Sequence, residues 1–184
     1  MKLSLLSVLL GLGLAVPQVY GLAKPNSFAA AARRFPRHVP SGVFLIVVGT
    51  LWFLWNVQQE PIADFAAIKP HMMVVFAAIG LGTCIFVQDY LAVRGLAVVF
   101  LLLAKLMVDT GRPYLGETPW VYLIQCWAYG LVVAGIWLTI SPWRLRDFLN
   151  WATANEKRIK VGSGIRLGFA LLVMALGLTA FRAM

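Results

Sequence analysis

The sequence predicts an all-α integral membrane protein, a bundle of about six transmembrane helices with two short interfacial amphipathic helices on the inner face. Of its 184 residues 61% are hydrophobic and only 12% are charged, and the mean hydropathy is +0.83. A soluble domain carries about 25% charged residues. Because apolar runs extend from one end of the chain to the other, we expect residues 1–184 to form a single transmembrane domain.

Six apolar runs are long enough to cross a bilayer, since a spanning helix needs about 20 mostly apolar residues and about 17 suffice. The boundary in residues 88–95, QDYLAVRG, is the weakest, because Asp89 and Arg94 are its only strong polar signals. If no loop interrupts the chain there, five spans remain. The expected spans are residues 3–22, 42–58, 71–88, 92–109, 119–141 and 163–181.

The distribution of basic residues predicts how the spans are oriented. The first span resembles a signal peptide, with Lys2 before an apolar run and a small-residue site near Gly21. Residues 23–41 hold four basic and no acidic groups, and residues 142–162 hold five basic and two acidic groups. Both segments resist translocation, so we expect a retained first helix, basic loops inside and both termini outside, compatible with a bacterial cytoplasmic membrane.

The two inner segments are expected to lie in the headgroup layer as amphipathic helices. Ser141 and Pro142 provide a helix start, and Leu145, Phe148 and Leu149 then fall on one side. Basic side chains on such helices bind anionic lipid, and DNA or RNA binding is not expected, because the basic residues punctuate apolar segments. The expected headgroup contacts are Arg33, Arg34, Arg37, Arg144, Arg146, Lys157 and Arg158.

The two inner segments also resemble each other. Residues 39–43, VPSGV, follow the first segment, and residues 161–165, VGSGI, follow the second. A duplicated hairpin would produce this similarity, and so would chance among apolar sequences of low complexity. Both explanations stay open.

The fourth span carries an unusual set of charges. Lys105, Asp109 and Arg112 are separated by four and three residues, so they share one helix face. Charges in hydrocarbon cost about 2.5 to 3.5 kcal/mol each on insertion scales, so these groups should pair, face the bundle interior or reach the headgroups. They form a candidate intramembrane polar site, in which Asp109 would titrate or bind a cation.

Patterns typical of catalysis and cofactor binding are missing from the sequence. The predicted topology places His38 and His71 on opposite sides of the membrane, which argues against a haem or metal site. Cys84 and Cys126 lie in spans without a CxxC motif, so no disulfide is expected. We find no HExxH, GxSxG, P-loop or dinucleotide-binding turn. We therefore expect no cofactor and no metal.

Small residues inside the spans permit close helix packing. Gly164 and Gly168 form a GxxxG motif, and residues 77–83 read AAIGLGT. Such contacts hold together the helices of one chain or dock the chain against a partner. Internal packing is our expectation for both segments.

The function favoured by the sequence is non-catalytic. A small hydrophobic chain without soluble domains fits an accessory or structural subunit that packs against a larger membrane complex or self-associates. The first alternative is a small proton- or ion-coupled transporter or channel that uses Lys105, Asp109 and Arg112. The second is a lipid-modifying membrane enzyme that uses Asp64, His71 or Asp109. The sequence specifies neither a solute nor a partner.

Overall fold

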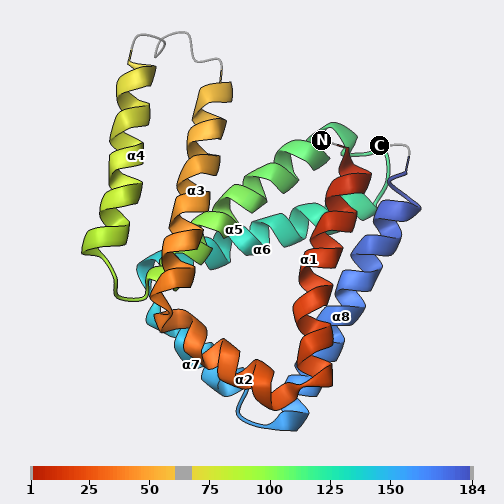
Figure 1. Cartoon of the computed structure of the whole chain (residues 1–184). Coiled ribbons are helices and arrows are strands. Elements are labelled where there is room, and N and C mark those ends of the chain that lie inside the picture. Colours follow the sequence, from red (N-terminus) through yellow and green to blue (C-terminus); the bar gives the residue numbers. More distant parts are fainter. Residues whose placement is uncertain (1, 61–67, 183–184) are drawn as a thin grey trace. The chain divides into compact units, whose positions relative to one another are not determined.

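The computed structural model describes residues 2–60 and 68–182, and these residues form helices joined by short connections (Figure 1). The long helices are α1 (Leu3–Ala23), α3 (Val39–Gln59), α4 (Lys69–Phe86), α5 (Leu91–Gly111), α6 (Trp120–Ile140) and α8 (Glu156–Leu178). The short ones are α2 (Pro25–Arg34), α7 (Trp143–Ala152) and the 3-10 turns η1 (Phe35–Arg37) and η3 (Arg112–Tyr114).

Six helices of the described chain are long and apolar enough to cross a membrane, which matches the number of spans expected from the sequence. The uncertain boundary is a real break, because α4 ends at Phe86 and α5 begins at Leu91. Tyr90 makes the turn with a φ of +53°, a left-handed conformation that is uncommon for residues other than glycine. Its carbonyl then accepts hydrogen bonds from the backbone N–H groups of Val93 and Arg94.

The two inner segments are helical, as predicted, and α2 and α7 have 10 residues each. The order long, short, long therefore occurs twice, with lengths of 21, 10 and 21 residues in α1 to α3 and of 21, 10 and 23 in α6 to α8. This order is what a duplicated hairpin would give. The location of α2 and α7 on the inner face stays a prediction.

Two compact units make up the chain. The first contains residues 1–34, 103–131 and 146–184, and the second contains residues 35–102 and 132–145. Helices α5 and α6 are divided between the units, so that one half of each helix belongs to the first unit and the other half to the second.

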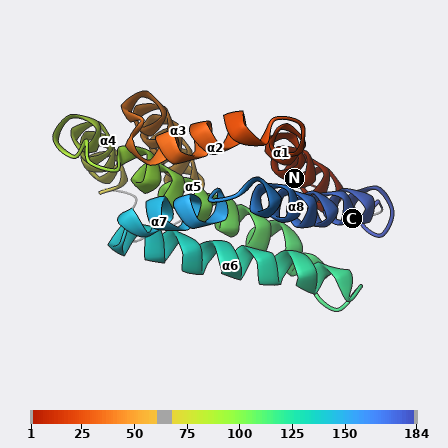
Figure 2. The ribbon, with the colours of Figure 1, turned by 90° about the horizontal axis from the view of Figure 1, so that it is seen from below.

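In the first unit, α1 and α8 run antiparallel and side by side (Figure 2). Glycines make this close approach possible: a Cβ on Gly11 would lie 2.8 Å from the carbonyl oxygen of Ala170, and one on Gly177 would lie 2.9 Å from that of Ser4. Real Cβ atoms essentially never come so close. The two backbones are therefore in contact, as in other small-residue helix pairs in membranes.

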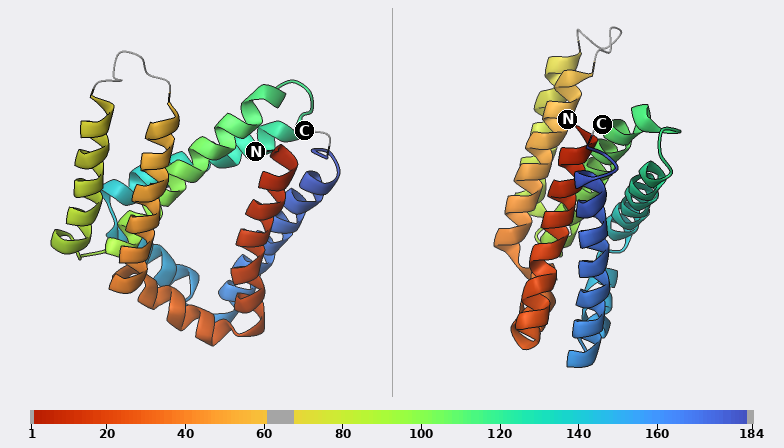
Figure 3. Two further views of the ribbon diagram at one scale, coloured as in Figure 1. Left: turned by 45° about the horizontal axis from the view of Figure 1, so that its top comes forward. Right: turned by 90° about the vertical axis from the view of Figure 1, so that its right-hand side faces the viewer.

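In the second unit, α3 packs against α4 (Figure 3), and the first half of α5 packs against α3 and the end of α6. The rings of Phe53 and Phe76 meet edge to face, with centroids 5.0 Å apart. A Cβ on Gly80 would collide with the Thr50 side chain, which confirms internal packing for the AAIGLGT segment. Beside this pair, Val93, Ala97 and Leu138 form a buried cluster.

The expectation for the GxxxG motif of α8 is wrong. A Cβ added to Gly164 or to Gly168 would meet nothing within 4 Å among the described residues. Both glycines are exposed, and the buried positions of α8 are instead Ile159, Ser163, Ala170, Val173, Leu176 and Gly177. The motif was assigned to the wrong face because glycine spacing alone does not show which side of a helix is covered.

Candidate functional site

The polar residues predicted in the fourth span form an ion pair. The Nζ of Lys105 lies 2.6 Å from Oδ2 of Asp109, one helical turn away on α5. The two side chains are 43% and 55% exposed, so the pair lies on an outer face of α5. Arg112 is exposed in η3, beyond the end of that helix. Mutual pairing is one of the three arrangements expected from the cost of unpaired charge in hydrocarbon.

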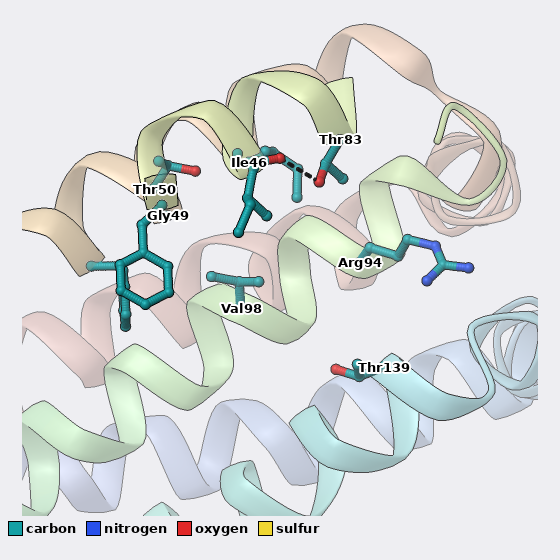
Figure 4. A pocket seen from close by; sticks show the side chains of 11 residues that line it. Ile46, Gly49, Thr50, Thr83, Arg94, Val98 and Thr139 are labelled. Carbon is teal, nitrogen blue, oxygen red and sulfur yellow. Dashed lines mark hydrogen bonds between the residues drawn. The ribbon is translucent and has the colours of Figure 1, made fainter. Parts of the chain in front are cut away.

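A cavity of about 340 Å³ lies within the second unit, among α3, α4, α5 and α6 (Figure 4). Its wall is mostly apolar, with Ile46, Phe53 and Val98 among the lining side chains. The polar lining groups are Arg94 and the hydroxyls of Thr50, Thr83 and Thr139. The hydroxyls of Thr83 and Thr139 donate to the carbonyls of Ile79 and Gly135, each 2.8 Å away, so toward a ligand these two hydroxyls can act only as acceptors.

Arg94 is the chemically distinctive residue of this cavity. It lies one turn into α5, and its buried Nε has no hydrogen-bond partner among the described residues. Figure 4 shows the Arg94 side chain at the end of the cavity where Thr83 and Thr139 lie. A buried, unpaired N–H group in an apolar wall favours binding of an acceptor, such as a carboxylate, a carbonyl or water. In the sequence Arg94 indicates a loop boundary, and an arginine inside an apolar run also indicates a polar site of this kind.

Several predicted headgroup-binding residues also contact protein. Arg33 donates from Nε to the hydroxyl of Thr153, 2.8 Å away, and so connects α2 to the segment between α7 and α8. The Arg37 guanidinium lies over the ring of Tyr90, 5.8 Å from its centroid. Arg146 pairs with Asp147 at 2.8 Å. Lipid contact by these three arginines, and by the exposed Arg34 and Arg144, stays a prediction.

The remaining two headgroup candidates, Lys157 and Arg158, lie together on a groove of the first unit. The groove has a volume of about 620 Å³ and is lined by α7, the turn after it and the first turns of α8. Trp151 contributes an aromatic wall and Arg166 a third cation. Arg166 was not among the residues predicted from the sequence, because it lies between Gly164 and Gly168 and this segment was interpreted only as a packing motif.

A second surface of α8 is formed by small residues. We call Gly164, Gly168, Leu171 and Ala175 the glycine face; all four are exposed, and their spacing of four, three and four residues puts them on one side of the helix. Without side chains at Gly164 and Gly168, the α8 backbone is accessible to another helix.

Of the groups proposed for an enzyme, the structure describes His71 and Asp109, which belong to different compact units. His71 is exposed near the start of α4, and Asp109 is paired with Lys105. Asp64 lies outside the described residues. Within the ranges that the structure describes, no three His, Cys, Asp or Glu side chains are grouped so that they could hold a metal ion. An enzymatic role therefore stays an untested alternative.

Comparison with known proteins identifies no relative. No protein-family model matches the sequence, and neither the curated proteins nor the solved structures contain a match.

Proposed function

We propose that the chain is a non-catalytic membrane subunit that packs against a larger membrane protein through the glycine face of α8. One observation carries the proposal: a Cβ at Gly164 or Gly168 would meet nothing within 4 Å among the described residues. Such a surface allows a second helix to approach the α8 backbone closely. Van der Waals contact of this kind drives helix association in lipid, where the hydrophobic effect does not.

The alternative is that the glycine face contacts lipid and no protein, and the low helix propensity of glycine argues against this alternative. Glycine in a helix interior is about 1 kcal/mol less favourable than alanine. At a position that faces only lipid, glycine has no advantage that offsets this cost, since any larger apolar side chain can contact lipid equally well. Two glycines one turn apart, followed by Ala175 on the same side, fit a docking surface.

The test is co-purification of the full chain in mild detergent, followed by mass spectrometry of the bound proteins. We expect the Gly164→Leu/Gly168→Leu double variant to lose its partner, because leucine side chains separate the backbones. Gly13→Leu is the matched control, since Gly13 also meets nothing within 4 Å but stands between Leu12 and Leu14 on α1. This variant should retain the partner.

Thermal unfolding of the partner-free chain separates loss of docking from loss of folding, because a Cβ at position 13, 164 or 168 meets nothing within 4 Å among the described residues. The proposal predicts that neither variant unfolds at a lower temperature than the wild type, since leucine is a better helix former than glycine. A wild-type chain that is monodisperse and free of other proteins would overturn the proposal. So would a partner that stays bound to the double variant, and a chain that associates only with itself would replace the larger complex with a homo-oligomer.

A further inference from the structure

The groove between α7 and α8 combines charge and apolar surface in a way that the docking proposal does not use. Three cationic side chains, those of Lys157, Arg158 and Arg166, line it. Among the described residues that line the groove, none is acidic. The nearest acids in sequence are engaged elsewhere: Asp147 pairs with Arg146 at 2.8 Å, and Glu156 pairs with Lys160 at 2.7 Å.

Two of the cations are held in place by the protein. The Arg158 guanidinium lies 5.2 Å from the ring centroid of Trp151 and donates to the carbonyl of the same residue at 3.3 Å. Arg166 donates from Nε to the carbonyl of Gly162 at 2.9 Å. A Cβ on Gly162 would lie 3.0 Å from a terminal nitrogen of Arg166, so glycine lets the guanidinium fold back over the helix. Such fixed guanidinium groups lose little conformational entropy when they bind a phosphate.

The other walls of the groove are apolar and aromatic. Phe148 and Trp151 are exposed, with ring centroids 6.1 Å apart, and Val161 and Ile165 follow on α8. Tryptophan at a membrane interface has one apolar side and one polar edge, and it lies where headgroups meet acyl chains. A free inorganic anion would bind the cationic side chains and leave these four apolar and aromatic side chains exposed. An anionic lipid would contact both the cationic side chains and the apolar ones.

We infer that this groove is a binding site for an anionic phospholipid, whose phosphate lies against Lys157, Arg158 and Arg166 and whose acyl chain lies along Val161 and Ile165. Basic pockets between membrane helices bind such headgroups. Three cations exceed the single charge of one phosphodiester, so a phospholipid with two phosphates should bind more tightly than one with a single phosphate. The groove and the glycine face use different residues of α8, and the inference does not rest on the docking proposal.

Native mass spectrometry of the full chain in non-ionic detergent tests the inference. Diphosphatidylglycerol, phosphatidylglycerol and phosphatidylcholine are titrated separately, and pyrophosphate is added as a lipid-free competitor. We expect affinity to fall in the order of lipid charge, and pyrophosphate to compete only weakly. Equal binding of phosphatidylcholine would overturn charge recognition, and full displacement by pyrophosphate would assign the site to a free phosphate compound.

Variants locate the binding within the groove. Arg166→Gln should weaken diphosphatidylglycerol binding roughly ten-fold or more, since a hydrogen bond to a charged group is lost. Lys157→Gln changes an exposed side chain and should also weaken binding, so the test does not depend on Arg166→Gln folding. Lys160→Gln is the control, because Lys160 is basic and nearby but lies outside the groove lining. Equal weakening by Lys157→Gln and Lys160→Gln would show non-specific surface charge and overturn the site.

Discussion

Helices α1 and α8 in the first unit, and α3 and α4 in the second, are both pairs of apolar helices, yet they pack differently. Helices α1 and α8 have eight and six buried residues, whereas α3 has three and α4 has none among the described residues. The α1–α8 contact is made by Gly11 and Gly177 against backbone oxygens. The α3–α4 contact is made by side chains, including Phe53, Phe76 and Thr50, beside a cavity.

The difference shows what determines packing between helices of similar composition. In lipid, apolar side chains gain nothing from leaving the solvent, so contact depends on how closely the surfaces fit. Glycines that meet a backbone give a close fit, and bulky side chains at a contact keep helices apart and leave space. Stability should therefore depend more on the glycines of α1 and α8 than on those of α4.

The largest effect is expected for Gly11→Leu. The new side chain would be forced against Ala170 and Met174 of α8, where backbone atoms cannot move aside. We expect a loss of about 3 kcal/mol in the free energy of unfolding, at the upper end of typical overpacking costs. Unfolding in detergent measures it. Gly13→Leu, on the open side of the same helix, should change stability little, and equal losses from both variants would contradict the proposed contact.

A smaller effect is expected for Gly80→Leu. The nearest atoms belong to the Thr50 side chain, which can rotate, and Gly80 and Thr50 both line the cavity that can take up the added volume. We expect a loss of about 1 kcal/mol, at the lower end of overpacking costs. The control is Gly82→Leu, since the closest atom to a Cβ there is in Phe86, 3.9 Å away. A loss as large as that of Gly11→Leu would remove the distinction between the two helix pairs.

The smallest effect is expected for Asp109→Asn, because the Lys105–Asp109 pair is exposed and joins residues one turn apart on α5. Exposed pairs of this spacing contribute about 0.3–0.5 kcal/mol. The same variant distinguishes the subunit proposal from the transporter alternative. Ion flux by the wild-type chain in liposomes, lost in Asp109→Asn, would favour a transporter, whereas the subunit proposal predicts no flux from either protein.

The local features of the fold were predictable from the sequence. Six helices long and apolar enough to cross a membrane and two short helices follow from apolar run length and from proline and polar breaks, which act over neighbouring residues. The Lys105–Asp109 pair was also predictable, because residues four apart on a helix are neighbours whatever the tertiary structure. Boundaries were less exact: α8 begins at Glu156, although its span was predicted from residue 163, because a helix continues past the apolar run that crosses the membrane.

Which face of each helix is covered was decided only by the tertiary structure. The sequence placed Gly164, Gly168, Gly11 and Gly177 inside apolar helices but did not show that the first two are open and the last two meet backbone. Nor did it show that Arg94 lines a cavity or that Arg166 joins Lys157 and Arg158 in a groove. The reason is physical: a transmembrane helix is apolar on all sides, so hydrophobic periodicity, which marks the buried face of a helix in water, gives no direction in lipid.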